Sequence, residues 1–387
     1  MKKISIVSSS RADYGILKNL IIKLQKDNSI KLNFYVTGSH FNSNFGKTVK
    51  EIYRDKLKIS KKIPMSFGNG KNINMSKVIS QGIANFSKIF YKDKSDLIII
   101  LGDRYEIFSV AIAAMVCQVP IAHLHGGELT KGAIDESIRH SISKMSHIHF
   151  VSTKEYYKRL IQLGEKRNFV FNVGSLGVEN TKKIKLLSID EIRKNYNIDF
   201  KKDTFIITLH PETLKAKNTK RNVSNLLSSL KNFKNCNFVF TMPSAEEGYN
   251  IINNEIINFC KKNKDSFYFK SLGQQAYFSF CKNASCVIGN SSSAIIEIPS
   301  LLTPSLDLGI RQMGRLRADS VLNTDFSKKN IIQSVKKCLK LKKLIQKKKF
   351  KYENPYEKKN TSSNILKIIK SLNLNNILTK EFKDLKF

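Results

Sequence analysis

The sequence predicts an α/β protein with two doubly wound, Rossmann-type domains. Short apolar runs of strand type alternate with stretches of helical periodicity, and this alternation pauses near residue 175 and resumes near residue 205. The run 96–101 is apolar at every position after Asp96, as expected of a parallel strand buried on both faces. A chain of 387 residues also exceeds one ordinary hydrophobic core. We therefore expect domains at 1–180 and 181–365 and a helical tail at 366–387.

In the first domain, strands and helices follow each other in nearly regular order. Leucine and isoleucine recur at helical spacing between the first two strands, at 17–25. The predicted strands are 4–7, 32–37, 96–101, 119–124, 148–152 and 170–173. The predicted helices are 17–25, 107–117, 135–145 and 156–163.

A charged stretch, 180–200, is interpreted as a linker with a short helix at 189–196. The α/β pattern then begins again. The predicted strands of the second domain are 205–209, 237–241, 267–269, 286–289 and 303–306. Its predicted helices are 224–230, 249–260, 275–282 and 294–298.

The composition is that of a globular protein. No stretch approaches the roughly 20 apolar residues that a bilayer span requires, and Met1-Lys2-Lys3 leads into a strand without a signal segment. The six cysteines are widely spread and form no CxxC pair, so we expect them to be reduced. These features predict a cytoplasmic protein without a membrane partner.

The formal net charge of +36 raises the question of nucleic-acid binding. The lysines are spread over the whole chain, and the densest run, 336–351, has leucine and isoleucine interleaved as on a solvated helix. Neither an aromatic stacking pattern nor a helix-turn-helix signature accompanies it. We therefore expect no specific nucleic-acid partner, although the charge favours anionic ligands.

Two polar clusters follow early strands of the first domain. The loop from Ser8 to Gly15 opens a helix, and its N–H groups and Arg11 suit a diphosphate; a serine N-cap with an exposed arginine is the alternative. The loop lacks the glycine-rich dinucleotide fingerprint, which disfavours NAD. Asp103 and Arg104 end the strand 96–101, where ligands bind in open α/β sheets; Asp103 as a helix N-cap is the alternative.

The stretch His123-Leu124-His125-Gly126-Gly127-Glu128 brings imidazole and carboxylate groups to the end of the next strand. Asp135, Glu136, Arg139 and His140 follow at the start of a helix, and together these groups suit proton transfer. His147-Ile148-His149 adds a second His-x-His pair, which raises the question of zinc. Strand alternation explains both pairs, so we expect no metal.

The second domain has its polar clusters after two of its own strands. His210 follows the strand 205–209, and Pro211 restricts its backbone; a capping histidine is the alternative. Gly289-Asn290-Ser291-Ser292-Ser293 opens a helix that carries Glu297, a pattern that suits a phosphate and ribose hydroxyls. Arg311 and Arg315 lie in a further glycine-containing loop.

Taken together, these stretches resemble the hydrolysing UDP-N-acetylglucosamine 2-epimerases of bacterial sialic-acid biosynthesis, from Lys3 to Ser320. The resemblance implies a GT-B-like architecture, with two Rossmann-type domains facing across a cleft and the C-terminal helices packed on the first domain. It further implies a UDP-sugar substrate, no metal or other cofactor, and a homodimer. The stretches that carry it are 10–15, 101–114, 123–128, 135–144, 162–165, 172–179, 210–213, 289–301 and 309–317.

The implied reaction converts UDP-N-acetylglucosamine to N-acetylmannosamine and UDP through a 2-acetamidoglucal. By motif match, Ser291, Ser292 and Glu297 would hold phosphate and ribose, and Arg11 would reach the diphosphate. The residues implied in catalysis are Asp103, His125, Glu128, Asp135 and His210. The remaining residues implied in substrate binding are Arg104, Glu136, Arg139, Arg311 and Arg315.

The chain departs from the family pattern at two places. His125 stands where many relatives carry a catalytic glutamate, so either Glu128 or His125 would take that role. Near Pro243, Ser244 and Glu246 replace the usual asparagine and aspartate. Two alternatives stay open: the same chemistry on a nucleotide-linked 2,4-diacetamido-trideoxyhexose, as in legionaminic-acid pathways, and a GT-B glycosyltransferase that passes the sugar to an acceptor.

Overall fold

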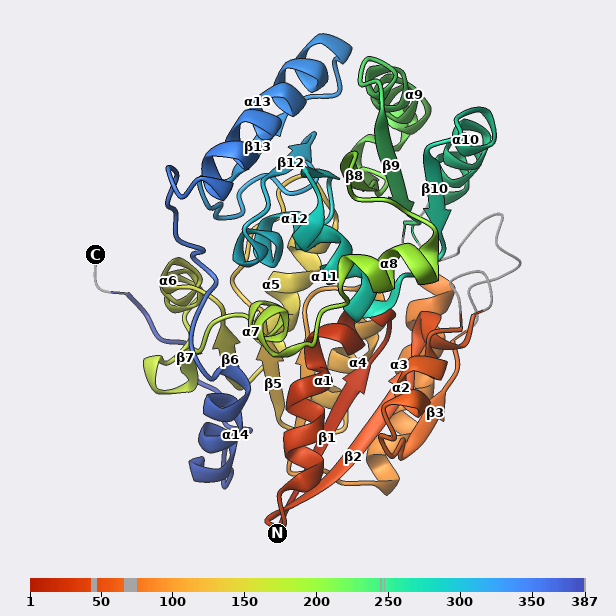
Figure 1. Cartoon of the computed structure of the whole chain (residues 1–387). Coiled ribbons are helices and arrows are strands. Elements are labelled where there is room, and N and C mark those ends of the chain that lie inside the picture. Colours follow the sequence, from red (N-terminus) through yellow and green to blue (C-terminus); the bar gives the residue numbers. More distant parts are fainter. Residues whose placement is uncertain (43–46, 66–74, 244–245, 247, 386–387) are drawn as a thin grey trace. The chain divides into compact units, whose positions relative to one another are not determined.

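The computed structural model describes residues 1–42, 47–65, 75–243, 246 and 248–385, and it forms two compact units. The first unit contains Met1–Glu128, Asp135–Asn180 and Tyr356–Phe387, and the second contains Leu129–Ile134 and Thr181–Pro355. Each unit is built on one parallel sheet flanked by helices (Figure 1). The predicted fold class of two Rossmann-type α/β units is therefore confirmed.

The first sheet has the strand order β3-β2-β1-β4-β5-β6-β7, so the chain changes direction across the sheet between β1 and β4. All of its pairs are parallel, with Ile4 opposite Leu97 and Ile6 opposite Ile99. The strands are β1 (Lys2–Ser8), β2 (Ile30–Thr37), β3 (Lys61–Ile63), β4 (Leu97–Leu101), β5 (Ile121–Leu124), β6 (Ile148–Val151) and β7 (Val170–Asn172). The helices are α1 (Arg11–Lys26), α2 (Val49–Arg54), α3 (Met75–Lys92), α4 (Tyr105–Val116), α5 (Asp135–Met145), α6 (Lys154–Gln162), α7 (Leu176–Lys183) and α14 (Thr361–Ser371).

Helices α1 and α14 cover one face of this sheet, in front of it in Figure 1. The residues of α1 that recur at helical spacing, from Leu17 to Leu24, are buried against β1, β2 and β4 together with Ile365 and Ile369 of α14. Burial of such aliphatic side chains contributes about 1.5–3 kcal/mol each. The C-terminal tail is thus an integral part of the first unit.

The second sheet has the order β10-β9-β8-β11-β12-β13 and is also parallel, with its change of direction between β8 and β11. One core lies under α9, α10 and α13, and another lies under α8 and α11. The strands are β8 (Asp203–Thr208), β9 (Cys236–Thr241), β10 (Ser266–Phe269), β11 (Cys286–Gly289), β12 (Ser305–Leu308) and β13 (Val321–Thr324). The helices are α8 (Ile189–Tyr196), α9 (Thr219–Leu230), α10 (Tyr249–Lys262), α11 (Gly273–Asn283), α12 (Ser293–Ile296) and α13 (Lys328–Gln346).

The interpretation of 180–200 as a linker is wrong, although the short helix predicted within it is confirmed as α8 (Ile189–Tyr196). Ile192 of α8 and Ile198 are fully buried in the second unit, and Phe200 packs against Phe280 with ring centroids 5.6 Å apart. The stretch looks hydrophilic because α8 is amphipathic and hides only one face. Its charged residues lie on the opposite face, toward solvent.

The predicted boundary between 180 and 181 agrees with the structure, whereas the boundary predicted between 365 and 366 lies between Pro355 and Tyr356. The chain returns to the first unit at Tyr356, whose hydroxyl bonds to that of Tyr156 at 2.8 Å and whose carbonyl accepts the Ser175 N–H. The short segment Leu129–Ile134 belongs to the second unit, where the Lys131 N–H donates to the Met313 carbonyl at 2.9 Å. No local composition signal marks either transition.

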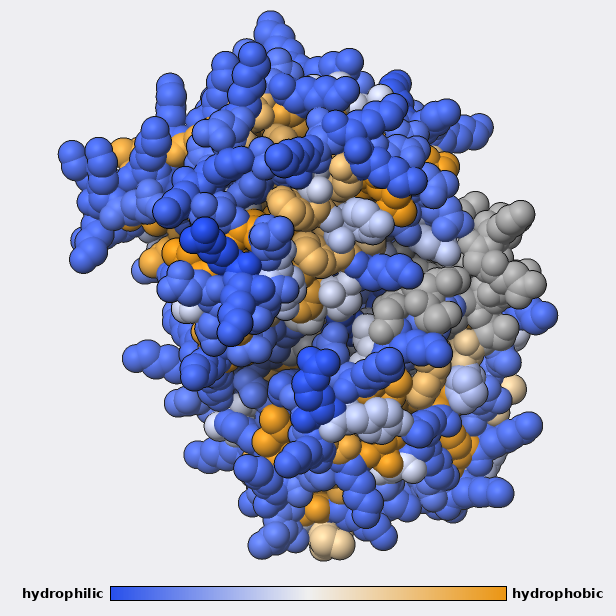
Figure 2. All heavy atoms as spheres, turned by 45° about the vertical axis from the view of Figure 1, so that its right-hand side comes forward, coloured by the Kyte–Doolittle hydropathy of each residue, from blue (hydrophilic) through white to orange (hydrophobic). Residues whose placement is uncertain are grey.

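The surface agrees with the composition. The face in Figure 2 is mostly hydrophilic, with apolar side chains in small separate groups. Within the described ranges, no helix has the length and apolar character needed to cross a bilayer. All six cysteines are free thiols.

Candidate active site

The loop after β1 combines an N-cap with the predicted arginine. The Ser10 hydroxyl accepts the Asp13 N–H at 3.3 Å and caps α1, and the Asp13 carboxylate accepts the N–H of Ser9 at 3.1 Å. Arg11 is the first residue of α1 and is partly exposed. The capping role that we considered for a serine thus holds for Ser10, and it fixes the loop that carries Arg11 at the carboxyl edge of the sheet.

Asp103 and Arg104 follow β4 but have different partners. Asp103 does not cap α4; its carboxylate pairs with the guanidinium of Arg139. Arg104 forms a two-point ion pair with the buried carboxylate of Glu106, at 3.1 and 3.2 Å. Behind this turn His123 donates from Nε2 to the Gly102 carbonyl at 2.7 Å, and burial lowers the pKa of His123 to about 3. His123 therefore supports the Asp103 turn as a neutral side chain.

His125 and Glu128 form a buried pair directly after β5. His125 Nδ1–H donates to Glu128 Oε1 at 2.8 Å, and the Ser152 hydroxyl donates to the same oxygen at 3.0 Å. The His125 backbone has φ +66°, a left-handed conformation that a residue with a side chain adopts rarely. Its Nε2 is buried without a hydrogen-bond partner among the described residues. In the neutral imidazole that donates from Nδ1, Nε2 presents a lone pair.

Arg139 connects the acidic residues of this cluster. Its side chain is 1% exposed, and its guanidinium bonds to Asp103, to Glu136 Oε2 at 3.2 Å and to the Glu128 carbonyl at 2.9 Å. Asp135 is the first residue of α5, one position before Glu136. The structure therefore brings Asp103, Glu128, Glu136 and Arg139 together in what we call the acidic cluster, and Arg139 is held by protein groups.

In the second unit, His210 follows β8 and is not a helix cap, because the next helical turn begins at Thr213. The Asn290 side chain holds the His210 backbone at both ends: Oδ1 accepts the His210 N–H at 2.7 Å, and Nδ2 donates to the His210 carbonyl at 2.9 Å. Glu212, two residues on, accepts the Ile310 N–H at 2.7 Å. These contacts join the loops that follow β8, β11 and β12.

The serine-rich stretch after β11 begins with a sharp turn. Gly289 has φ +142°, and a Cβ there would lie 1.8 Å from the Thr208 carbonyl oxygen, so the turn requires glycine. Ser291 and Ser292 are partly exposed, whereas Glu297 is buried. The predicted helix 294–298 is only the four-residue α12 (Ser293–Ile296) followed by a 3₁₀ turn. An anion here would depend on hydroxyls and N–H groups more than on a helix dipole.

The two predicted arginines of the loop after β12 are both bonded within the second unit. Arg311 donates to Glu246 Oε1 at 2.9 Å, and Arg315 Nε donates to Gln312 Oε1 at 2.6 Å. Gln312 in turn donates to the Asn290 carbonyl at 3.1 Å. Ser244, the other departure from the family pattern in this region, lies outside the described residues.

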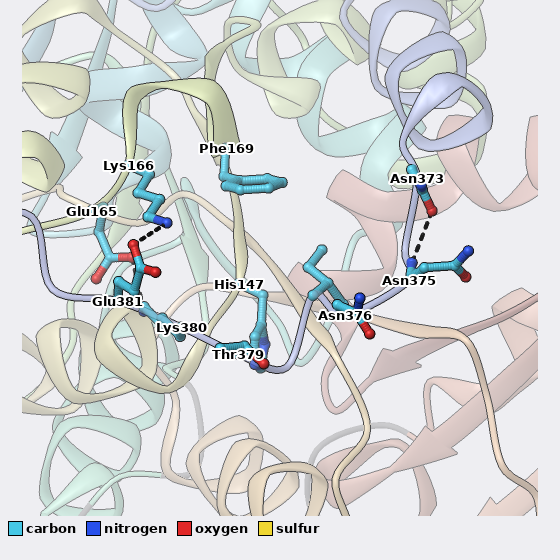
Figure 3. Close-up of a pocket in the computed structure, with 11 residues that line it drawn as sticks. His147, Glu165, Lys166, Phe169, Asn373, Asn375, Asn376, Thr379, Lys380 and Glu381 are labelled. Carbon is cyan, nitrogen blue, oxygen red and sulfur yellow. Dashed lines mark hydrogen bonds and ion pairs between the residues drawn. The ribbon is translucent and has the colours of Figure 1, made fainter.

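The second His-x-His pair belongs to a different part of the first unit. His149 Nε2–H donates to Glu165 Oε2 at 2.9 Å, and Lys144 and Lys380 both pair with Glu165 at 2.8 Å. Beside this pair, near the amino-terminal end of β6, lies a cavity of about 210 Å³, where Figure 3 shows Lys166 paired with Glu381. The cavity lies at the opposite edge of the sheet from the acidic cluster, so we assign the pair a structural role.

The contacts of Glu165 with His149, Lys144 and Lys380 make the stability of the fold depend on pH. Burial alone raises the pKa of Glu165, but His149, Lys144 and Lys380 outweigh it and hold that pKa at about 2. Such a displacement below the usual 4.5 corresponds to about 3 kcal/mol, present above pH 4.5 and lost as the pH falls toward 2. We expect Glu165→Gln to lower the free energy of unfolding at pH 7. Below pH 4, the difference in this free energy between the variant and the wild type should become smaller. Urea unfolding at several pH values measures both; a gap independent of pH would contradict the assignment.

Sequence reasoning missed two groups that support these residues. Ser152 bonds to Glu128, and its only signal was its place at the end of a predicted strand. Asn290 lies in the stretch Gly289–Ser293, but nothing in that pattern indicated that its side chain bonds to His210.

Comparison with known proteins identifies the family. The profile of the UDP-N-acetylglucosamine 2-epimerases matches residues 22–370. This chain belongs to the UDP-N-acetylglucosamine 2-epimerase family. The resemblance to these enzymes is therefore confirmed, and the chain is a member of a family of hydrolysing nucleotide-sugar epimerases.

Its relatives differ in the substrates that they are named for. The GDP/UDP-N,N′-diacetylbacillosamine 2-epimerase (hydrolyzing) of Campylobacter jejuni is 42% identical over 99% of both chains. The UDP-N,N′-diacetylbacillosamine 2-epimerase (hydrolyzing) of Legionella pneumophila is 32% identical over 98% of this chain and 99% of its own. The structure of the UDP-GlcNAc 2-epimerase of Neisseria meningitidis bound to UDP-GlcNAc has a TM-score of 0.81, with 18% identity over 96% of this chain and all of the other.

Proposed function

We propose that this epimerase acts on a nucleotide-linked 2,4-diacetamido-trideoxyhexose and releases the free 2-epimer and the nucleoside diphosphate. The observation that supports this substrate is the 42% identity, over essentially the whole chain, to an enzyme named for diacetylbacillosamine. The Legionella relative points the same way. The sequence-based prediction placed UDP-N-acetylglucosamine first, and it becomes the second candidate here.

In the first step, a base removes the proton at C2 while the C1–O bond to the diphosphate breaks, which gives a 2-acetamidoglycal. We assign the base to His125 Nε2, because Glu128, which itself accepts from Ser152, favours the ring tautomer that leaves this nitrogen able to accept a proton. Glu128 also stabilises the imidazolium that forms. Of the two residues that the sequence left open for this role, Glu128 and His125, we thus propose His125.

In the second step, water adds its hydroxyl group to C1, and a proton returns to C2 on the opposite face. Asp135 and Asp103 are the proposed carboxylates for these transfers, with Arg139 fixing the position of Asp103. The leaving diphosphate gains negative charge as C1–O breaks. We propose that His210 stabilises this charge and that Arg11 and Arg104 contact the diphosphate.

We assign the nucleotide to the second unit, at Ser291, Ser292 and Glu297. Glu297→Ala should weaken binding of UDP by about 1–3 kcal/mol, or roughly 5- to 150-fold in Kd, because two ribose hydroxyls lose their acceptor. The value of kcat at saturating substrate should change much less. Calorimetric titration with UDP and steady-state kinetics separate these effects; an unchanged Kd would remove Glu297 from the nucleotide site.

Proton NMR in D₂O tests the proposed function directly. The purified protein should convert UDP-N,N′-diacetylbacillosamine to a free sugar that carries deuterium at C2, with one equivalent of UDP released and no acceptor added. UDP-N-acetylglucosamine in a parallel tube should react at least tenfold more slowly in kcat/KM. A faster reaction with UDP-N-acetylglucosamine would reverse the substrate proposal, and sugar release only with an added acceptor would indicate a glycosyltransferase.

Two expectations from the sequence stay predictions at this point. The homodimer is tested by sedimentation equilibrium of the purified protein. The cytoplasmic location is tested by fractionation of the cells that express it.

A further inference from the structure

Asn290 makes contacts that the nucleotide-binding role of its loop does not explain. It is fully buried at the end of β11, and its side-chain amide closes a ring with the His210 backbone through bonds of 2.7 and 2.9 Å. Paired strands exchange the same two hydrogen bonds, one to an N–H and one to a carbonyl, but here a side-chain amide makes them. It continues the β8–β11 pairing beyond Gly289, which lies opposite Thr208.

Asparagine suits this position because the site needs one acceptor and one donor at a fixed spacing. Oδ1 meets an N–H and Nδ2 meets a carbonyl, so aspartate would match the first partner and repel the second. Asn290 is itself held by its carbonyl, which accepts from Gln312 Nε2 at 3.1 Å. Gly289 places the amide there through a backbone conformation that L-residues rarely adopt.

We infer that Asn290 is a positioning residue for the reaction: by clamping both backbone polar groups of His210, it holds the imidazole where the leaving diphosphate is to be stabilised. The inference rests on the role proposed above for His210. Pro211 restricts the chain on the other side of His210, and Glu212 ties it to Ile310. The imidazole of His210 thus extends from a backbone that is held at His210 by Asn290 and restrained at the two residues that follow.

The Asn290→Asp variant tests the clamp through a pH profile. At pH 8 the carboxylate faces the His210 carbonyl without a proton, and we expect kcat to fall about tenfold or more while the Kd for UDP stays within about threefold. At lower pH the protonated carboxyl can donate to that carbonyl, so the ratio of variant to wild-type kcat should rise. A merely structural role would give a ratio that does not depend on pH.

Asn237→Asp is the matched control. Asn237 is also buried, and its Nδ2 donates to the Asp199 carbonyl at 2.6 Å and to Thr204 Oγ1 at 3.1 Å, at the opposite end of the sheet. It should lower the melting temperature and leave a flat kcat ratio. In a His210→Ala background, Asn290→Asp should change kcat less than about twofold, because its effect passes through the missing imidazole. The inference would be overturned if the effects of His210→Ala and Asn290→Asp on kcat multiplied in the double variant. It would also be overturned if the ratio of Asn290→Asp to wild-type kcat did not change with pH.

A measurement on the wild-type protein covers the case in which Asn290→Asp does not fold. The clamp predicts slow hydrogen exchange at the His210 amide, although the residue lies outside the strand; rapid exchange would overturn the inference. This readout needs no substrate. If the wild-type protein releases no UDP from either sugar nucleotide, the proposed function fails, and with it the catalytic part of the inference, while slow exchange still establishes the clamp.

Discussion

Replacing Glu128 with glutamine is expected to lower kcat by about 10²- to 10⁴-fold, the usual contribution of general acid–base groups. The carboxylate orients His125 through the 2.8 Å bond to Nδ1–H, and the amide cannot stabilise the imidazolium in the same way. Binding of UDP should be nearly unaffected, because the nucleotide is assigned to the second unit. Single-turnover release of UDP and calorimetric titration give the two values.

Glu165→Gln is the matched control, because Glu165 is also buried and also accepts a hydrogen bond from a histidine, His149. It lies toward the amino-terminal end of β6, away from the acidic cluster. We expect it to reduce stability and to leave kcat within about twofold of wild type. If both substitutions lowered kcat equally, the loss at Glu128 would reflect general destabilisation. If Glu128→Gln had no effect, Glu128 would leave the mechanism.

The periodic parts of the fold could be predicted from the sequence because burial fixes their patterns. Strand β4 is apolar at every position, since helices cover both of its faces, and α5 was predicted with its observed bounds. The edge strand β3, with the sequence Lys61-Lys62-Ile63, was not predicted: one buried residue gives no periodicity. Helix α8 was predicted with its observed bounds, but its packing into the second unit was missed, because its charged face dominates the composition.

The candidate residues could be predicted at the level of clusters but not of partners. Strand ends indicated that Asp103, His125 and His210 would lie at carboxyl edges, since those edges collect the loops of a parallel sheet. The partners depend on how loops from distant parts of the chain meet. Ser152 reaches Glu128 across 24 positions and Asn290 reaches His210 across 80, distances over which no local pattern carries information.

The partners of Arg139 could not be predicted from the sequence either, and they change the role that we assign to it. As a guanidinium in a motif it was predicted to contact the substrate, whereas its 1% exposure and its three protein partners place it inside the acidic cluster. We propose that it acts on the reaction through Asp103 and Glu136. We expect Arg139 to contribute to stability as well as to activity, because it neutralises the mostly buried carboxylates of Asp103 and Glu136.

Arg139→Met should therefore cost about 3–5 kcal/mol in the free energy of unfolding of the first unit, the range for breaking a buried ion pair from one side. The side chains of Asp103 and Glu136 keep 18% and 23% of their surface exposed, so water can partly replace the arginine, and we expect the lower end of that range. The value of kcat should fall as well, by about 10²-fold, because Asp103 loses its fixed position. Arg139→Lys should lie between wild type and Arg139→Met, since one ammonium cannot reproduce the separate bonds of a guanidinium.

Arg159→Met separates loss of a cation from loss of an ion pair. Arg159 is partly exposed and donates to the carbonyl of Gly127, a neutral partner next to Glu128. Its replacement should therefore lower the free energy of unfolding by about 1 kcal/mol. Urea unfolding followed by tyrosine fluorescence, with kcat measured on the same samples, gives the comparison. Equal losses for Arg139→Met and Arg159→Met would mean that the carboxylates do not depend on Arg139. A large loss of stability with kcat retained in the folded fraction would remove Arg139 from the reaction and leave it a purely structural ion pair.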